Sequence, residues 1–185
     1  MEIINLGATN SILNQFVAEL RDVTIQTDSL RFRRNIERIG EILSYEISKR
    51  VSYQNKNIQT PLGQASLMVP SSPIVISTIL RAGLPFHQGF LNYFDHAENA
   101  FVSAYRKYKD RLNFDIHIEY IASPRLKGKT LIITDPMLAT GSSMELAFQA
   151  LLTKGEPEQI HVASIIASKQ AIDYIKDKMP GDKTT

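Results

Sequence analysis

The chain has 185 residues, of which 43% are hydrophobic and 22% are charged, as in an ordinary single-domain globular protein. Its 21 basic and 19 acidic side chains give a net charge of +2, which offers no support for binding to nucleic acid or to an anionic membrane. Cysteine is absent, which excludes disulfides, thiolate metal sites and cysteine nucleophiles.

The first third of the sequence predicts an arm followed by a long helix. Residues 1–26 carry little pattern, and we expect an arm that packs on this or a neighbouring subunit of a homodimer or higher homo-oligomer. From Thr27 the pattern is helical, with Asp28 or Ser29 as the N-cap. One helix face collects the apolar side chains of Phe32, Ile36, Ile39, Leu43 and Ile47. Residues 51–70 are polar and rich in turn formers.

From residue 74 onward, strand and helix patterns alternate. The predicted strands are 74–80, 100–105, 129–134 and 160–167, and the predicted helices are 84–94, 143–154 and 168–178. Residues 114–119 alternate apolar and polar side chains, which indicates a half-exposed antiparallel strand. The order predicts one α/β domain over residues 1–185, with a doubly wound, mainly parallel sheet and flanking helices.

The junction that follows the apolar strand 130–134 is the most informative part of the chain. Asp135 stands at the carboxyl end of this strand, where open α/β sheets keep their ligand crevice. Residues 140–143 then bring free backbone N–H groups and three hydroxyls to a helix N-terminus, which favours an anion. An acid for sugar hydroxyls beside a phosphate cradle predicts a phosphorylated ribose. The alternative is a helix cap and a strand end without a ligand.

This junction resembles the ribose-phosphate loop of the type I phosphoribosyltransferases, and in detail that of the uracil phosphoribosyltransferase family. The family signature is Asp-Pro-Met-Leu-Ala-Thr-Gly-Gly-Ser, and eight of its nine positions match residues 135–143. Ser142 replaces the usual glycine, so binding is expected to persist if the backbone there does not need a positive φ. Residues 78–84 are similar to a second family segment, Ile-Leu-Arg-Ala-Gly-Leu.

The resemblance implies transfer of the 5-phosphoribosyl group from phosphoribosyl pyrophosphate to uracil, which gives uridine monophosphate and pyrophosphate in pyrimidine salvage. It implies that Asp135 binds the ribose hydroxyls and that residues 139–143 hold the 5′-phosphate. The substrate loop that it implies consists of Asp135, Pro136, Met137, Leu138, Ala139, Thr140, Gly141, Ser142 and Ser143.

Two arginines are implied for the pyrophosphate site. Arg81 follows a strand and precedes two small residues, which let an anion approach; the alternative is a structural arginine paired with a carboxylate. Arg106 lies in the basic turn 105–111, which resembles a mobile β-hairpin lid over a polyanion; the alternative is an exposed hairpin tip. Tyr108 stands where the family often has an acid.

No metal site built by protein side chains is expected, because the four histidines form no i,i+4 pair. Any Mg²⁺ would arrive with the pyrophosphate, whose oxygens it prefers. No apolar run approaches the roughly 18 residues of a membrane span, and no secretory signal pattern is visible, so a cytoplasmic protein is expected.

The uracil-binding segment of the family follows the position of Thr185, and nothing like it occurs within these residues. A chain that ended there would be expected to bind the sugar phosphate with little transfer to uracil. The alternatives are a phosphoribosyltransferase for another base, a regulator that binds the sugar phosphate without turnover, and a plain structural domain. The single acid before Pro136 argues against the purine enzymes.

Overall fold

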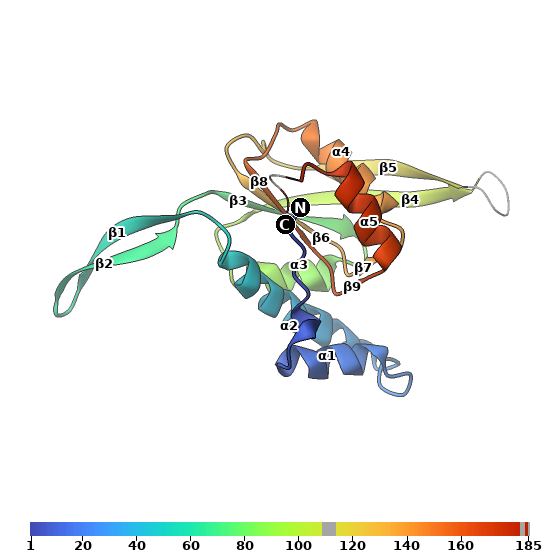
Figure 1. Ribbon diagram of the computed structural model, residues 1–185, viewed down its shortest axis with the longest axis horizontal. Helices are drawn as coiled ribbons and strands as arrows, with labels where there is room; N and C mark the ends of the chain where they lie inside the picture. The colour runs from blue at the N-terminus through green and yellow to red at the C-terminus, as the bar shows by residue number, and fades with distance from the viewer. Residues whose placement is uncertain (109–113, 182–183, 185) are drawn as a thin grey trace.

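A five-stranded sheet forms the centre of the molecule (Figure 1). The computed structural model describes the backbone of residues 1–108, 114–181 and 184, and the side chains of these residues except 104–108 and 114–119. The strand order is β5-β4-β3-β6-β8, and every pairing is parallel except that of β5 with β4. The strands are β3 (Ile74–Leu80), β4 (Glu98–Tyr108), β5 (Phe114–Ala122), β6 (Thr130–Thr134) and β8 (Gln159–Ala163).

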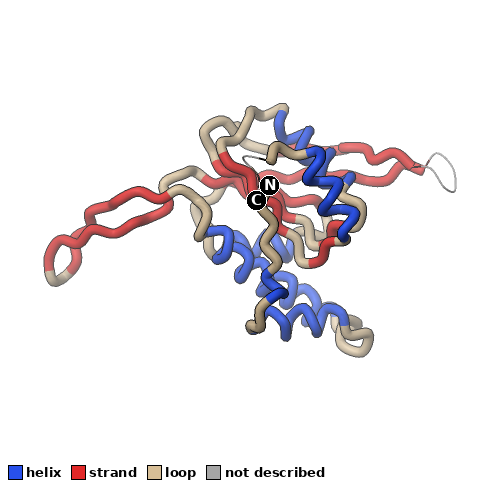
Figure 2. The backbone as a smooth tube through the Cα atoms, in the orientation of Figure 1, coloured by secondary structure: helices blue, strands red, loops and turns tan. Residues whose placement is uncertain are grey.

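Helices cover both faces of this sheet and enclose a separate core on each (Figure 2). One face carries α1 (Ile12–Arg21), α2 (Ser29–Ser48) and α3 (Leu84–Leu91), and the other carries α4 (Ser142–Leu152) and α5 (Lys169–Lys178). The predicted doubly wound, mainly parallel α/β fold is therefore confirmed. None of the helices in the described part of the chain combines the length and the apolar character needed to cross a membrane.

The long helix α2 begins where the sequence predicts. The Asp28 side chain is its N-cap and accepts hydrogen bonds of 3.0 Å from the backbone N–H groups of Leu30 and Arg31. Ile36 and Ile39 on the predicted apolar face are buried against the sheet.

Residues 1–26, for which the sequence predicts only an arm, contain the 3₁₀ turn η1 (Leu6–Ala8) and the helix α1. Helix α1 packs on α2 of the same chain through Glu19, whose carboxylate accepts from Asn35 at 2.7 Å and from Arg31 at 3.1 Å. Hydrogen bonds from Asn35, Gln15 and Arg31 lower the pKa of Glu19 to about 2.

Residues 51–70 form a hairpin of β1 (Tyr53–Thr60) and β2 (Gly63–Pro70), where only turn-rich sequence was recognised. The hairpin extends away from the sheet at the left of Figure 1, and most of its residues are exposed. Pro61 and Leu62 make the hairpin turn, and Gly63, the first residue of β2, has a φ of +134°.

Two glycines let α2 and α3 approach each other closely. A Cβ atom on Gly40 of α2 would lie 2.6 Å from the carbonyl oxygen of Phe86, and one on Gly89 of α3 would lie 2.1 Å from that of Glu37. Both obstacles are backbone atoms, so a side chain here would force the helices apart.

We expect Gly89→Ala to lower the free energy of unfolding by about 1–3 kcal/mol, because the added methyl group overpacks the contact between α2 and α3. Chemical denaturation monitored by circular dichroism measures this loss. Gln88→Ala, at the neighbouring exposed position of α3, is the matched control and should stay within about 0.5 kcal/mol of the wild type. Equal stability of the two variants would contradict the close helix contact.

Candidate functional site

The segments predicted to bind ligand meet at the carboxyl edge of the sheet. Strands β3 and β6 are parallel neighbours whose last register pair is Thr78 with Thr134. Asp135 follows β6 directly, and its backbone N–H donates to the carbonyl of Ala163 in β8 at 3.1 Å. Arg81 follows β3, so parallel pairing brings the two predicted segments to one edge.

The Asp135 carboxyl group is half-buried, and burial raises its pKa from 3.8 to about 6. The backbone N–H of Met137 hydrogen-bonds to it and acts in the opposite direction, but more weakly. The carboxylate is therefore short of donors within the described protein. A ligand with hydroxyl groups would supply them.

The loop that follows offers unpaired donors. The backbone N–H groups of residues 140–143 donate to no other residue that the structure describes, and they lie at the N-terminus of α4. The hydroxyls of Thr140 and Ser142 lie 2.8 Å apart. Together with the helix dipole, this arrangement favours an anion of phosphate size.

The backbone of the loop does not require a positive φ at Ser142. Gly141 takes the left-handed conformation, with a φ of +83°, and caps α4. Ser142 is the first residue of the helix, and no non-glycine residue in the described ranges has a positive φ. The backbone can therefore accept serine at this position.

Two threonine hydroxyls join the ends of β3 and β6. The Thr78 hydroxyl donates to the Thr134 carbonyl at 3.2 Å, and the Thr134 hydroxyl donates to the Ser77 carbonyl at 3.1 Å. Both side chains are fully buried. A Cβ atom on Gly83 would lie 2.0 Å from the Thr78 hydroxyl oxygen, so the loop after β3 packs directly on this junction.

Arg81 is exposed, and its side chain forms no ion pair with any residue in the described part of the chain. The peptide bond between Leu80 and Arg81 is cis. The alternative of a structural arginine paired with a carboxylate is thus not observed among these residues. Its guanidinium is available to a ligand.

Arg106 was predicted in the turn 105–111 but lies in β4, because this strand continues to Tyr108, and its backbone pairs opposite Ile116 of β5. Its side chain and residues 109–113 of the basic turn lie outside the described part of the chain. The antiparallel hairpin that was predicted is confirmed, whereas the role of a lid stays a prediction.

The substrate loop also contains a short strand that the sequence analysis missed. Strand β7 (Met137–Leu138) pairs in parallel with β9 (Ile166–Ala167), and the single strand that the sequence predicts over 160–167 is divided into β8 and β9. Two-residue strands carry no detectable periodicity, so no sequence signal could have revealed this pairing.

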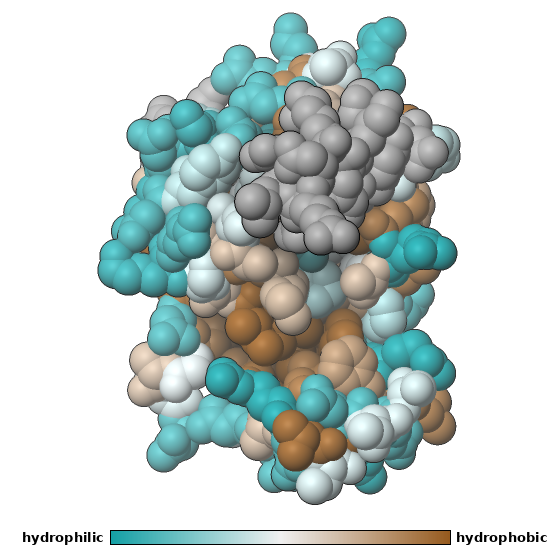
Figure 3. Space-filling model, turned by 90° about the vertical axis from the view of Figure 1, so that its right-hand side faces the viewer, coloured by the Kyte–Doolittle hydropathy of each residue, from teal (hydrophilic) through white to brown (hydrophobic). Residues whose placement is uncertain are grey.

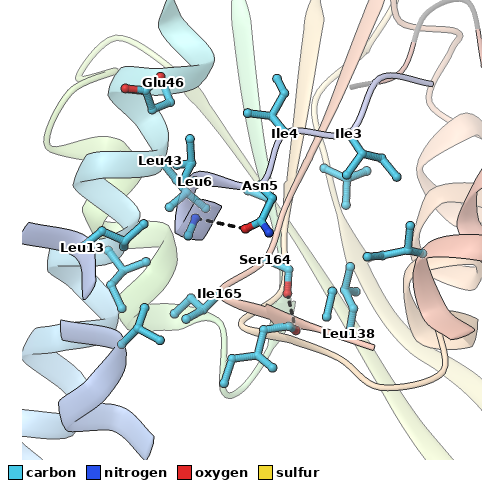
Figure 4. Close-up of a pocket in the computed structure, with 18 of the residues that line it drawn as sticks. Ile3, Ile4, Asn5, Leu6, Leu13, Leu43, Glu46, Leu138, Ser164 and Ile165 are labelled. Carbon is cyan, nitrogen blue, oxygen red and sulfur yellow. Dashed lines mark hydrogen bonds between the residues drawn. The ribbon is translucent and has the colours of Figure 1, made fainter. Parts of the chain in front are cut away.

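An apolar cavity of about 760 Å³ adjoins this loop between the N-terminal segment, α2 and the segment after β8 (Figure 4). Leu138 of the substrate loop lines it together with Leu13, Leu43 and Ile165. The face of the molecule seen in Figure 3 is hollowed, and hydrophobic side chains gather in the hollow. Nowhere among the described residues do three or more acidic or histidine side chains form a metal-binding group.

Comparison with known proteins gives concordant results. A family model described as uracil phosphoribosyltransferase matches residues 8–184. A uracil phosphoribosyltransferase from Porphyromonas gingivalis is 70% identical over 185 residues, which cover all of this chain and 85% of that protein. Another, from Pyrococcus furiosus, is 33% identical over 169 residues, which cover 90% of this chain and 71% of that protein.

Solved structures agree with the fold. A protein from Aquifex aeolicus superposes with a TM-score of 0.82 at 28% identity, over 95% of this chain and 81% of that one. A purine phosphoribosyltransferase from Pyrococcus horikoshii reaches a TM-score of 0.54 at 14% identity, over 73% of this chain and 74% of that one. At such low identity the second match concerns the fold alone.

The raised pKa of Asp135 predicts a pH-dependent stability. The folded-state pKa of about 6 exceeds the unfolded value, so the folded protein binds the proton more tightly, and its stability falls as the pH rises from 4 through 6. Asp135→Asn removes this penalty, so the ligand-free variant should be about 3 kcal/mol more stable than the wild type at pH 8. Denaturant unfolding at several pH values measures the difference. A gain that did not shrink toward pH 4 would contradict the assignment.

Proposed function

Because the chain belongs to the uracil phosphoribosyltransferase family, we propose that the loops at the carboxyl edge of its sheet perform the reaction of that family. The enzyme transfers the 5-phosphoribosyl group of phosphoribosyl pyrophosphate to uracil. A bond forms between the anomeric carbon and a ring nitrogen, the bond to pyrophosphate breaks, and the nitrogen loses its proton. The products are uridine monophosphate and pyrophosphate, in pyrimidine salvage.

The ribose phosphate is assigned to the loop after β6. The half-buried Asp135 carboxylate accepts hydrogen bonds from the ribose hydroxyls, and the unpaired N–H groups of residues 140–143 hold the 5′-phosphate. The proposal rests on one observation. The partly buried Asp135 carboxylate lies next to the backbone N–H groups of residues 140–143, which have no protein acceptor among the described residues. One ligand that bears both hydroxyls and a phosphate satisfies both.

The pyrophosphate is assigned to Arg81 and Arg106. Charge builds up on this group as the bond to the anomeric carbon breaks, and cations placed there stabilise the transition state. Arg81 supports this role because it is exposed beside the ribose loop and has no ion-pair partner among the described residues. Arg106 is assigned by its resemblance to the family and its place in the hairpin.

Magnesium fits this site as an ion bound to the pyrophosphate of the substrate. The described residues offer Asp135 but no group of three acidic or histidine side chains, so these residues form no cage for the ion. Mg²⁺ prefers phosphate oxygens and retained water, and when bound to pyrophosphate it offsets part of the charge on that group.

Replacement of Asp135 tests the proposed function. We expect Asp135→Asn to lower kcat for uridine monophosphate formation by about 10²-fold or more, because an amide cannot accept two charge-assisted hydrogen bonds. Turnover is measured with phosphoribosyl pyrophosphate and uracil, with and without Mg²⁺, and with other bases in place of uracil. Asp95→Asn, an exposed acid at the opposite edge of the sheet, is the matched control and should keep wild-type activity. Near-wild-type turnover of Asp135→Asn would contradict the proposal that Asp135 binds the ribose hydroxyls.

We further propose that the chain forms a homodimer through the β1–β2 hairpin. An isolated two-stranded hairpin is at best marginally stable in water. Here β1 and β2 pair only with each other in the described structure, and Leu62, Leu67 and Met68 are exposed at 100%, 51% and 62%. The hairpin carries a single charged residue, Lys56, so a second copy can pack on it without burying many charges.

Substitution in the hairpin tests the dimer. The double variant Leu67→Glu and Met68→Glu should shift the protein from dimer to monomer in sedimentation velocity, because carboxylates would be buried at the interface. The double variant Asn57→Glu and Gln59→Glu, at exposed polar positions of β1, is the charge-matched control. A wild-type protein that sediments as a monomer would refute the interface.

A further inference from the structure

The substrate loop is attached to the chain that leads into α5. The backbone N–H groups of Ile165 and Ile166 donate to the carbonyl of Pro136, each at 3.2 Å. The N–H of Ser168 donates to the carbonyl of Leu138 at 2.9 Å. Residues 136–138 are therefore held in place by residues 165–168, which lie about thirty positions later in the chain.

A single side chain continues this attachment into the phosphate loop. The Ser168 hydroxyl donates to the carbonyl of Ala139 at 2.6 Å. The same oxygen accepts from the backbone N–H of Ala171 at 3.0 Å, as the N-cap of α5. One hydroxyl thus links the loop to the start of a helix.

The orientation of the Ala139 carbonyl determines where the next donor points. In a trans peptide unit the C=O and N–H groups are coplanar and point in opposite directions. With the carbonyl of Ala139 held toward α5, the N–H of Thr140 points away from that helix. Thr140 is the first of the unpaired donors in the phosphate loop.

The far end of the loop rests on α5 as well. A Cβ atom on Gly141 would lie 3.1 Å from both the carbonyl oxygen of Ala171 and the Tyr174 ring. The Tyr174 hydroxyl donates to Glu145 in the first turn of α4. Contacts with α5 therefore lie on both sides of the donor cluster.

We propose that Ser168 is a positioning residue for phosphate binding: its hydroxyl orients the Ala139–Thr140 peptide so that the N–H groups of the loop face the ligand. This inference rests on the proposed function, since the ligand is the 5′-phosphate of phosphoribosyl pyrophosphate. Ser168 acts through the loop backbone. Small losses of alignment at such a site are costly, because a displacement of about 1 Å can reduce activity about 10²-fold.

Three variants separate this role from that of a helix cap. Ser168→Ala loses both hydrogen bonds and should raise KM for phosphoribosyl pyrophosphate about tenfold, with a smaller effect on kcat. Ser168→Thr keeps a hydroxyl that can make both bonds and should restore KM. Ser11→Ala removes the N-cap of another helix, α1, and should lower the melting temperature without changing KM.

Hydrogen exchange of the ligand-free protein provides a readout that does not depend on activity. In Ser168→Ala the amides of Ile166, Ser168 and Glu145 should exchange faster than in the wild type, whereas Ser11→Ala should leave them unchanged. An unchanged KM in Ser168→Ala, no recovery in Ser168→Thr, or an equal rise of KM in Ser11→Ala would overturn the proposal. A wild type without transferase activity would refute the proposed function, while the exchange data would still decide whether Ser168 holds the loop.

Discussion

The parallel pairing of β3 with β6 is the constraint on which the site depends. It brings the ends of two strands to the same edge, and there the buried hydroxyls of Thr78 and Thr134 bond across to backbone carbonyls. The loop with Arg81 and the loop with Asp135 start within a few residues of this junction. Their relative position is therefore set by the sheet, because neither loop has enough described internal contacts to set it alone.

Much of the fold and part of the site follow from local sequence. Strand β6 is a run of five residues that are all buried. Helix α2 begins at the predicted capping aspartate, Asp28, and buries residues of its predicted apolar face. The loop could be recognised because the acid after β6 and the small residues that start α4 are consecutive in the sequence and match a family signature at eight of nine positions. In each of these elements the signal and the structure lie within a few neighbouring residues.

The elements that were missed depend on partners distant in sequence. The β1–β2 hairpin has almost no apolar alternation, since most of its side chains are exposed, and pattern analysis needs a buried face. Strands β7 and β9 are two residues each, and they exist only because β6 and β8 end side by side. The sequence predicts Ser168 only as the first residue of the helix 168–178, and its hydrogen bond to Ala139 depends on a residue 29 positions earlier in the chain.

The same edge of the sheet combines two local energetic costs in the ligand-free protein. Burial disfavours the ionised form of Asp135, and the N–H groups of residues 140–143 have no protein acceptor among the described residues. The two buried cores on either face hold the loop in this arrangement. In the proposed binding mode a sugar phosphate would supply hydroxyl donors to the carboxylate and an anion to the N–H groups, so binding would relieve both costs at once. Under this proposal, the features that weaken the ligand-free protein are the ones that would favour a ligand in which hydroxyls and phosphate occur together.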